Sequence, residues 1–205
     1  MADALTADRT AVPAPKPGAI LLTRHGEPDI SRKVKLNAEG YRTFWARYET
    51  MGIIAGQHPP AELSSLAAGA GALVSSTRLR SIQSAQVLAP DRTFIPHQIL
   101  VEAPLPPPHF PSWVKLSPKV WGFIARFWWW FFNHHEGEET RRQAEIRAGE
   151  AATILEGLAA SGEDVLVTAH GFFNFMIGRA LKTRGWRMSS SQGYKYWSAR
   201  RFERI

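Results

Sequence analysis

Three short apolar runs, at residues 19–22, 72–74 and 165–167, constrain the fold of this chain most strongly. Each run has the length of a buried strand, and a polar stretch with basic or imidazole side chains comes directly after it. Segments with helical periodicity lie between the runs. Strands that alternate with helices predict an α/β protein, here a three-layer α/β/α sandwich with a mostly parallel central sheet.

The remaining elements follow from periodicity and turn residues. In the helix expected over residues 39–51, aromatic side chains recur at three- and four-residue steps, and charged residues, including Glu49, lie on the opposite face. Further helices are expected over residues 62–68, 79–88, 140–160 and 172–182. A short strand is expected at residues 93–96 and a closing strand at 194–202.

Length and composition indicate one domain. The chain has 205 residues, of which 44% are hydrophobic, enough for one sizeable core over residues 18–205. Residues 1–17 carry three prolines and are expected to form a disordered arm. They show neither the basic start nor the apolar stretch of a signal peptide, so a cytoplasmic location is expected.

Charge and cysteine content narrow the function. The formal net charge is +7, which favours anionic partners, but the basic residues are spread along the chain. No nucleic-acid-binding signature is recognisable, so nucleic acid is not expected as a partner. The chain contains no cysteine, which excludes disulfides, thiolate metal sites and a cysteine nucleophile.

Residues suited to phosphate chemistry follow each of the three runs. Arg24 and His25 follow the first, Arg80 the second and His170 the third. Ligands of open α/β sheets collect beyond the carboxyl ends of the strands, so these side chains are expected to converge. An arginine fork matches phosphate oxygens, and a neutral imidazole is a competent nucleophile toward phosphorus.

Four motifs in one order carry a family resemblance. They are "LLTRHGE" from residue 21, "LNAEG" from residue 36, "SSTRLRSIQSA" from residue 75 and "VLVTAHGFF" from residue 165. Together they resemble the histidine phosphatase superfamily, also called the phosphoglycerate mutase-like family. The resemblance implies a phosphoglycerate mutase-like fold, a transiently phosphorylated His25, a phosphate-binding Arg80 and a second active-site histidine at His170. Thr77 and Ser84 stand where the family usually has proline and threonine.

The family also uses a proton donor for the leaving oxygen. The resemblance points to Glu102, in "ILVEAPLP", although Glu27 is also close to His25 in sequence. Asn174 lies one helical turn after His170 and is a candidate substrate-binding residue, although a polar residue in a first helical turn is ordinary. Arg78 is interpreted as a rim residue.

The implied reaction needs neither a metal nor a cofactor. Arg24, Arg80 and His170 are expected to bind the phosphoryl oxygens while His25 attacks phosphorus. No Gly-x-x-x-x-Gly-Lys loop or His-Glu-x-x-His pattern is present, and "GAGAL" at residues 69–73 precedes a strand instead of following one. No metal site is assigned: His134 and His135 are interpreted as an exposed helix end.

An insertion at about residues 104–135 departs from the family pattern. It begins with prolines and continues as "WVKLSPKVWGFIARFWWWFFNHH" over residues 113–135. A membrane span is disfavoured, because lysines and an arginine interrupt a stretch of barely sufficient length. Three readings stay open for residues 113–132: a buried core helix, an aromatic wall or lid that selects an apolar leaving group, and a patch for peripheral membrane contact.

Together the patterns predict a metal-independent phosphomonoesterase that acts through phosphohistidine on a small-molecule or lipid-like phosphate ester. The aromatic insertion favours a bulky or apolar ester. A phosphomutase of the same family is the first alternative, and a catalytically silent phosphate-binding or scaffold protein is the second; a nucleic-acid or membrane adaptor is the third. The C-terminal "YKYWSARRFERI" and residues 189–191 are interpreted as structural. The natural substrate and the oligomeric state stay open.

Overall fold

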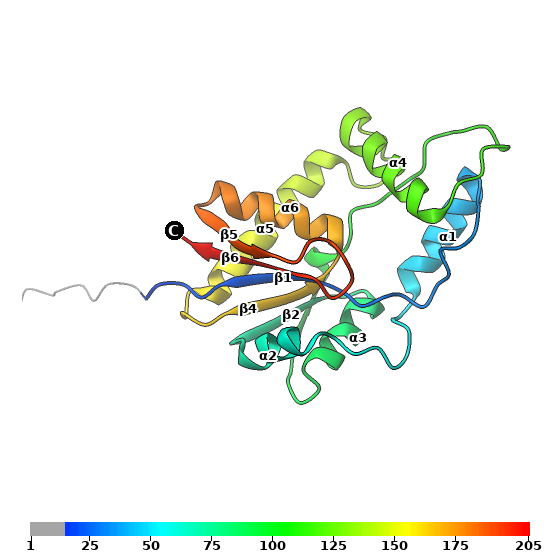
Figure 1. Cartoon of the computed structure of the whole chain (residues 1–205). Coiled ribbons are helices and arrows are strands. Elements are labelled where there is room, and N and C mark those ends of the chain that lie inside the picture. The colour runs from blue at the N-terminus through cyan, green and yellow to red at the C-terminus, as the bar shows by residue number, and fades with distance from the viewer. Residues whose placement is uncertain (1–14) are drawn as a thin grey trace, which may run out of the picture.

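The computed structural model describes residues 15–205, so the predicted arm lies almost wholly outside the described residues. Within that range the strands form one six-stranded sheet in the order β3-β2-β4-β1-β6-β5 (Figure 1). The strands are β1 (Ile20–Arg24), β2 (Ala72–Ser76), β3 (Ile95–His97), β4 (Val165–Ala169), β5 (Trp186–Ser191) and β6 (Ala199–Arg204).

The sheet is mostly parallel, as predicted. Strands β1, β4, β2 and β3 pair in parallel, whereas β6 pairs antiparallel with both β1 and β5. The three apolar runs form the neighbouring strands β2, β4 and β1. The predicted closing strand was wrong in its bounds, because residues 194–198 are irregular and β6 begins at Ala199. Strand β5 was not predicted, because all its residues after Trp186 are exposed.

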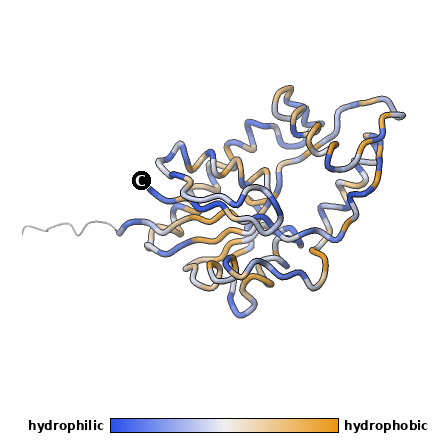
Figure 2. The backbone as a smooth tube through the Cα atoms, in the orientation of Figure 1, coloured by the Kyte–Doolittle hydropathy of each residue, from blue (hydrophilic) through white to orange (hydrophobic). Residues whose placement is uncertain are grey.

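Helices cover both faces of the sheet and complete the predicted sandwich (Figure 1). Side chains of β1 alternate between the two sides: Ile20 and Leu22 pack with α5 and α6, and Leu21 packs with α2 and α3. The apolar stretches along the strands are visible in Figure 2. The covering helices are α2 (Ala61–Gly69), α3 (Leu79–Leu88), α5 (Arg141–Ala159) and α6 (Gly171–Thr183), and a 3-10 turn, η1, spans Gln98–Leu100.

Two further helices, α1 (Ala38–Thr50) and α4 (Pro118–Phe132), lie beyond the carboxyl ends of the parallel strands (Figure 1). Together with residues 104–117 we call them the cap. Trp121 of α4 is fully buried between them, stacks on Tyr41 with ring centroids 5.9 Å apart, and donates its indole N–H to the Leu36 carbonyl. The cap therefore has its own small apolar core.

The aromatic insertion contains a regular helix with clear end signals. The Ser117 hydroxyl accepts the Val120 N–H, Pro118 occupies the first turn, and Asn133 ends α4 in the left-handed conformation. Trp129 packs into the main core, whereas other members of the helix are exposed, so the reading as a buried core helix holds for one face of it only. The readings as an aromatic wall and as a membrane-contact patch stay predictions. Among residues 15–205 no helix combines the length and apolar character required to cross a membrane.

Candidate active site

A cavity of about 490 Å³ lies between the carboxyl ends of the strands and the cap. The strand register forms its floor: Arg24 of β1 pairs in parallel with Ala169 of β4, so His25 and His170, the next residues on each strand, lie side by side. Their ring centroids are 5.2 Å apart. The predicted residues His25, Arg24, Arg80, His170 and Glu102 all line this cavity.

His25 is buried and held in one tautomer. Its Nδ1 lies 2.7 Å from the carbonyl oxygen of Gly26. A carbonyl oxygen can only accept, so Nδ1 carries the proton and Nε2 carries the free lone pair. Burial, together with the charges of Arg80 and Arg24, holds the pKa of His25 well below its ordinary value. The imidazole is therefore neutral and nucleophilic at neutral pH.

Gly26 is required by the close approach of a tryptophan. A Cβ at this position would lie 2.4 Å from the ring of Trp197. The Gly26 N–H donates to the Ser84 hydroxyl on α3, 2.8 Å away, which ties the loop after β1 to the neighbouring helix. Ser84 stands where the family usually has threonine, and its hydroxyl accepts this hydrogen bond.

His170 is the N-cap residue of α6 and is also fully buried. Its Nδ1 lies 3.3 Å from Nη2 of Arg80, and its Nε2 lies 2.9 Å from the Ser76 hydroxyl. Because a guanidinium can only donate, Nδ1 is the acceptor and Nε2 carries the proton. Burial and the charge of Arg80 hold the pKa of His170 well below its ordinary value, so this ring is neutral as well.

Arg80 is fully buried in the first turn of α3 and bonded to the cap. Its guanidinium donates to the Tyr48 carbonyl at 3.0 Å and forms an ion pair with Glu49 at 2.8 Å. Arg78, the predicted rim residue, also pairs with Glu49, at 2.7 Å. The sequence predicted that Glu49 lies on the charged outer face of its helix. Its contact with two arginines about 30 residues away leaves no local signal in the sequence.

Arg24 is held by the C-terminal segment. It donates to the Tyr194 carbonyl at 2.6 Å, and its guanidinium lies 4.2 Å from the centre of the Tyr196 ring. Tyr196 also lies beside His25, with ring centroids 5.8 Å apart. The interpretation of "YKYWSARRFERI" as purely structural was therefore incomplete, because this stretch contributes to the site. Its sequence contains no motif that could have revealed this.

Glu102 lies between the floor and the cap, at the start of α6. Its carboxylate accepts the backbone N–H of Phe173 at 2.8 Å and that of Phe172 at 3.3 Å. Backbone N–H groups at a helix N-terminus favour a bound anion. The longer contact leaves Oε2 the less engaged oxygen of the carboxylate.

Two other candidates lie outside the cavity wall. Asn174 is buried, and its amide donates to the Thr23 carbonyl at 3.0 Å; it is not among the described residues that line the cavity. Glu27, the second candidate proton donor, is exposed and lines a different surface hollow. Within the described chain, the geometry thus gathers the carboxyl of Glu102, and not that of Glu27, with the histidines.

The wall of the cavity as a whole is aromatic and cationic. Aromatic side chains come from α1, from α6 and, with Tyr194, from the C-terminal segment. The charged wall residues comprise five cations and, within the described residues, one carboxylate, Glu102. The aromatic residues are Tyr41, Phe44, Trp45, Tyr48, Phe172, Phe175 and Tyr194, and the cations are Arg24, Arg32, Arg80, Lys119 and Arg126. Such a wall favours an anionic molecule with an apolar body. Residues 15–205 contain no cluster of three side chains suited to holding a metal ion.

Comparisons with known proteins bear on the fold. No family model matches the chain, and no curated protein sequence matches it significantly. Among solved structures, it is similar to a phosphoserine phosphatase variant from Entamoeba histolytica in complex with phosphoserine, with 13% identity, a TM-score of 0.51, and 81% of this chain and 80% of that one covered. It is also similar to a mycobacterial glucosyl-3-phosphoglycerate phosphatase, with 15% identity, a TM-score of 0.50 and the same coverage. The chain therefore has the histidine phosphatase, or phosphoglycerate mutase-like, fold.

Proposed function

We propose that the protein is a metal-independent phosphomonoesterase of the histidine phosphatase superfamily, acting through a phosphohistidine on His25. The observation that carries the proposal is the state of that residue: a neutral imidazole with its proton on Nδ1, beside two arginines and a second histidine. This arrangement combines a nucleophile with fixed positive charge for a phosphoryl group.

In the first half-reaction, Nε2 of His25 attacks phosphorus and the bond to the ester oxygen breaks. The ester binds together with one proton, which Glu102 holds. Glu102 gives this proton to the departing oxygen, so the alcohol leaves neutral. The phosphorylated ring is cationic, and its Nδ1–H donates to the Gly26 carbonyl, which stabilises that charge. Arg24 and Arg80 balance the charge on the transferring oxygens.

His170 has a separate part in the proposal. The arginine charges that lower the pKa of His170 are opposed when a phosphoryl dianion binds. Binding therefore favours protonated His170, which can donate to a phosphoryl oxygen. In the free enzyme the same ring accepts from Arg80 and so orients that guanidinium.

In the second half-reaction, a water molecule attacks phosphorus and the N–P bond breaks. Glu102, now a carboxylate, takes the proton of the water and returns to its starting state. The products are inorganic phosphate and neutral His25. A mutase would instead return the phosphoryl group to an alcohol, and the same residues would serve that step.

The test is phosphate release from para-nitrophenyl phosphate in excess EDTA. Wild-type activity should survive the chelator, and His25→Ala should lower it by at least about a thousandfold. His58→Ala is the matched control, because His58 is exposed and does not line the cavity; it should keep full activity. Activity that persists in His25→Ala contradicts the proposal. A folded but inactive wild type favours a catalytically silent phosphate-binding protein.

A further inference from the structure

Two polar groups in the roof of the cavity are buried without a hydrogen-bond partner in the described chain: the hydroxyl of Tyr41 and Nε of Arg126. Both residues line the cavity, and Tyr41 is 1% exposed. A buried polar group without a partner costs roughly what a lost hydrogen bond costs, so such groups usually serve a ligand or a water. The mechanism above uses neither of them.

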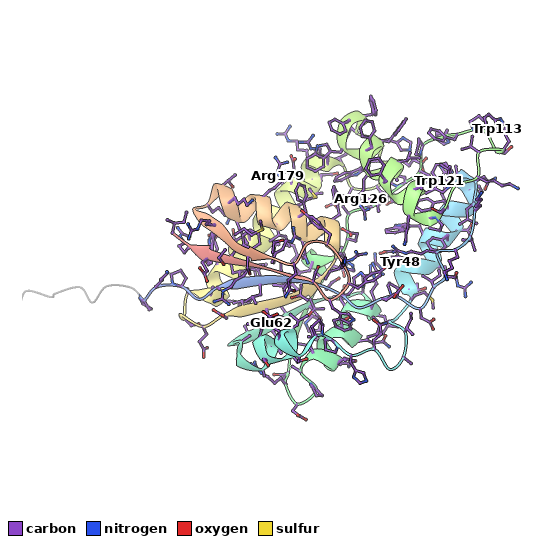
Figure 3. The ribbon with its side chains drawn as sticks, viewed as in Figure 1. Tyr48, Glu62, Trp113, Trp121, Arg126 and Arg179 are labelled. Carbon is purple, nitrogen blue, oxygen red and sulfur yellow. The ribbon has the colours of Figure 1, made fainter. Side chains whose placement is uncertain are left out.

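The two groups lie together across a glycine of α4. A Cβ at Gly122 would stand 3.5 Å from the Tyr41 hydroxyl and 3.9 Å from Nη1 of Arg126. Figure 3 shows Arg126 on the side of α4 that faces the sheet. The Tyr41 hydroxyl and the Arg126 guanidinium therefore border the same small volume beside Gly122, which has no side chain to fill it.

This volume is close to the departing group of the proposed reaction. The Arg126 guanidinium lies 5.4 Å from the centre of the Phe172 ring, and the backbone N–H of Phe172 contacts Glu102, the proposed proton donor. No ion pair with Arg126 is found in residues 15–205. Burial raises the pKa of Tyr41, so its hydroxyl stays protonated and can donate.

We propose that Tyr41 and Arg126 form a subsite for an anionic oxygen group on the leaving group. This inference rests on the proposed function. The substrate class is then a phosphomonoester whose alcohol has an aromatic or apolar body and carries a second anionic group, such as a carboxylate or a second phosphate. The aromatic roof contacts the body, and Arg126 and Tyr41 bind the second anion.

The experiment compares phenyl phosphate with the carboxyphenyl phosphates. Wild type should prefer at least one carboxylated isomer, and Arg126→Met should lower kcat/KM for that isomer by about tenfold or more while changing phenyl phosphate by less than about threefold. Tyr41→Phe removes only the hydroxyl and should have a smaller effect of the same selectivity. Arg179→Met is the matched control, because Arg179 lies over the Trp130 ring outside this cavity.

The outcomes separate the two proposals. Hydrolysis of phenyl phosphate tests the phosphatase alone, and the ratio between the esters tests the subsite. Equal loss on both esters, or no loss in Arg126→Met, overturns the subsite. If wild type hydrolyses neither ester, the proposed phosphatase activity is contradicted. The subsite is then tested by measuring the binding of the two esters through tryptophan fluorescence. Equal affinity of wild type and Arg126→Met for the carboxylated ester overturns the subsite.

The outer face of α4 carries a second and independent observation. Val120, Phe123, Phe127 and Phe131 recur at three- and four-residue steps, so they lie on one face of the helix, and all are exposed, Phe123 by 70%. Exposed Phe132 lies beside Phe127, with ring centroids 6.0 Å apart. Exposed Trp113 lies at the outer tip of the loop before α4 (Figure 3). We call these six residues the aromatic face.

The segment that carries the aromatic face has charged residues of one sign. No aspartate or glutamate occurs between Ala103 and His135, and exposed Lys115 and Lys119 lie in the same segment. A backbone bridge between Leu36 and Leu116 brings exposed Lys35 to the same part of the cap. Large exposed apolar patches mark interaction sites, and an anionic partner complements this one.

An anionic lipid surface fits these features better than a second copy of the chain. Tryptophan and phenylalanine beside lysine suit the headgroup region of a bilayer, where aromatic rings and cations are both accommodated. A self-complementary dimer through this face would set like charges against one another. We infer that the aromatic face docks on anionic bilayers, with the cavity on the opposite side of α4 close to the membrane surface.

Vesicle co-sedimentation tests this inference. The full chain should sediment with vesicles of phosphatidylcholine and phosphatidylglycerol in equal amounts, and much less with phosphatidylcholine alone. Replacing Phe123, Phe127 and Phe131 by serine should lower the partition coefficient by at least about tenfold. The matched control replaces Val87, Ile95 and Ile146 by serine, because these are exposed apolar residues of other surfaces.

A second variant guards against misfolding. Lys35→Glu with Lys115→Glu keeps the aromatic residues and should weaken binding to the anionic vesicles alone. Wild type that stays in the supernatant with anionic vesicles at low salt overturns the inference, as does unchanged binding in both variants. Self-association that the serine variant abolishes, without vesicle binding in wild type, would identify an interface between copies instead.

Discussion

The floor and the roof of the cavity are built in opposite ways. The floor consists of residues that directly follow strands, so the parallel register between β1 and β4 is enough to bring His25 and His170 together. The roof is assembled from α1 and α4, two helices about 80 residues apart in sequence, around Trp121. Under the proposed function, the floor determines the reaction and the roof determines which ester reacts, and substitutions on each side can test this division.

The largest expected effect concerns the integrity of the roof. Trp121→Ala removes a fully buried indole and its hydrogen bond to Leu36, which should lower the free energy of unfolding by about 3–5 kcal/mol. Phe123→Ala, two residues away on the exposed side of α4, should change it by less than about 0.5 kcal/mol. Urea unfolding measures both. Equal effects would mean that the cap does not have the core described here.

An effect of similar size is expected on the floor. Arg80→Met should lower kcat/KM by about a thousandfold, roughly 4 kcal/mol of transition-state stabilisation, because it removes fixed positive charge beside the phosphoryl group. Arg78→Met loses its own ion pair with Glu49 but lies outside the cavity wall, and it should cost less than about tenfold. Steady-state kinetics on one aryl phosphate compares the two variants. Similar losses would contradict the assignment of Arg80.

Glu102 joins the floor to the roof, and its effect should depend on the leaving group. Glu102→Gln cannot transfer a proton, so we expect a loss of about a hundredfold for an alkyl phosphate, whose alkoxide leaves poorly. The loss should be small for para-nitrophenyl phosphate, because that phenolate departs without protonation. A uniform loss across leaving groups would indicate that Glu102 acts through its contacts with α6 and not as the proton donor.

The smallest effect is on stability as the pH falls. The folded-state pKa values of His25 and His170 lie well below 6.5, whereas both histidines titrate near 6.5 when the chain is unfolded. Below that pH the unfolded chain binds protons that the folded chain does not, so each histidine lowers the free energy of unfolding by up to about 1.4 kcal/mol per pH unit. His25→Asn should reduce this slope between pH 6.5 and 5.5, as measured by urea unfolding. An unchanged slope would mean that His25 titrates normally in the folded protein.

The difference between floor and roof also explains what the sequence could predict. Arg24, His25, Arg80, Glu102 and His170 were all predicted, because each belongs to a local motif or follows a strand, and the structure brings all five to one cavity. The sandwich and its mostly parallel sheet were confirmed on the same local evidence. The roles of these residues stay predictions.

What the sequence could not predict depends on contacts between distant segments. Glu49 reaches Arg80 across 31 residues, and Tyr194 holds Arg24 across 170. In the aromatic insertion, composition alone could not separate the buried face of α4, with Trp129, from its exposed face, with Phe131, until the partners of the helix were known. Strand β5 was missed because its exposed residues show no apolar alternation.

The central claim is tested most directly by trapping the intermediate. The enzyme is mixed with a phosphate ester, quenched in alkaline denaturant, where phosphohistidine survives, and digested for mass spectrometry, with phosphorus NMR to identify the nitrogen that carries the phosphoryl group. The account predicts a phosphoryl group on Nε2 of His25 that is absent from His25→Ala. Phosphate release without a phosphorylated chain, or with the phosphoryl group on another residue, would contradict it.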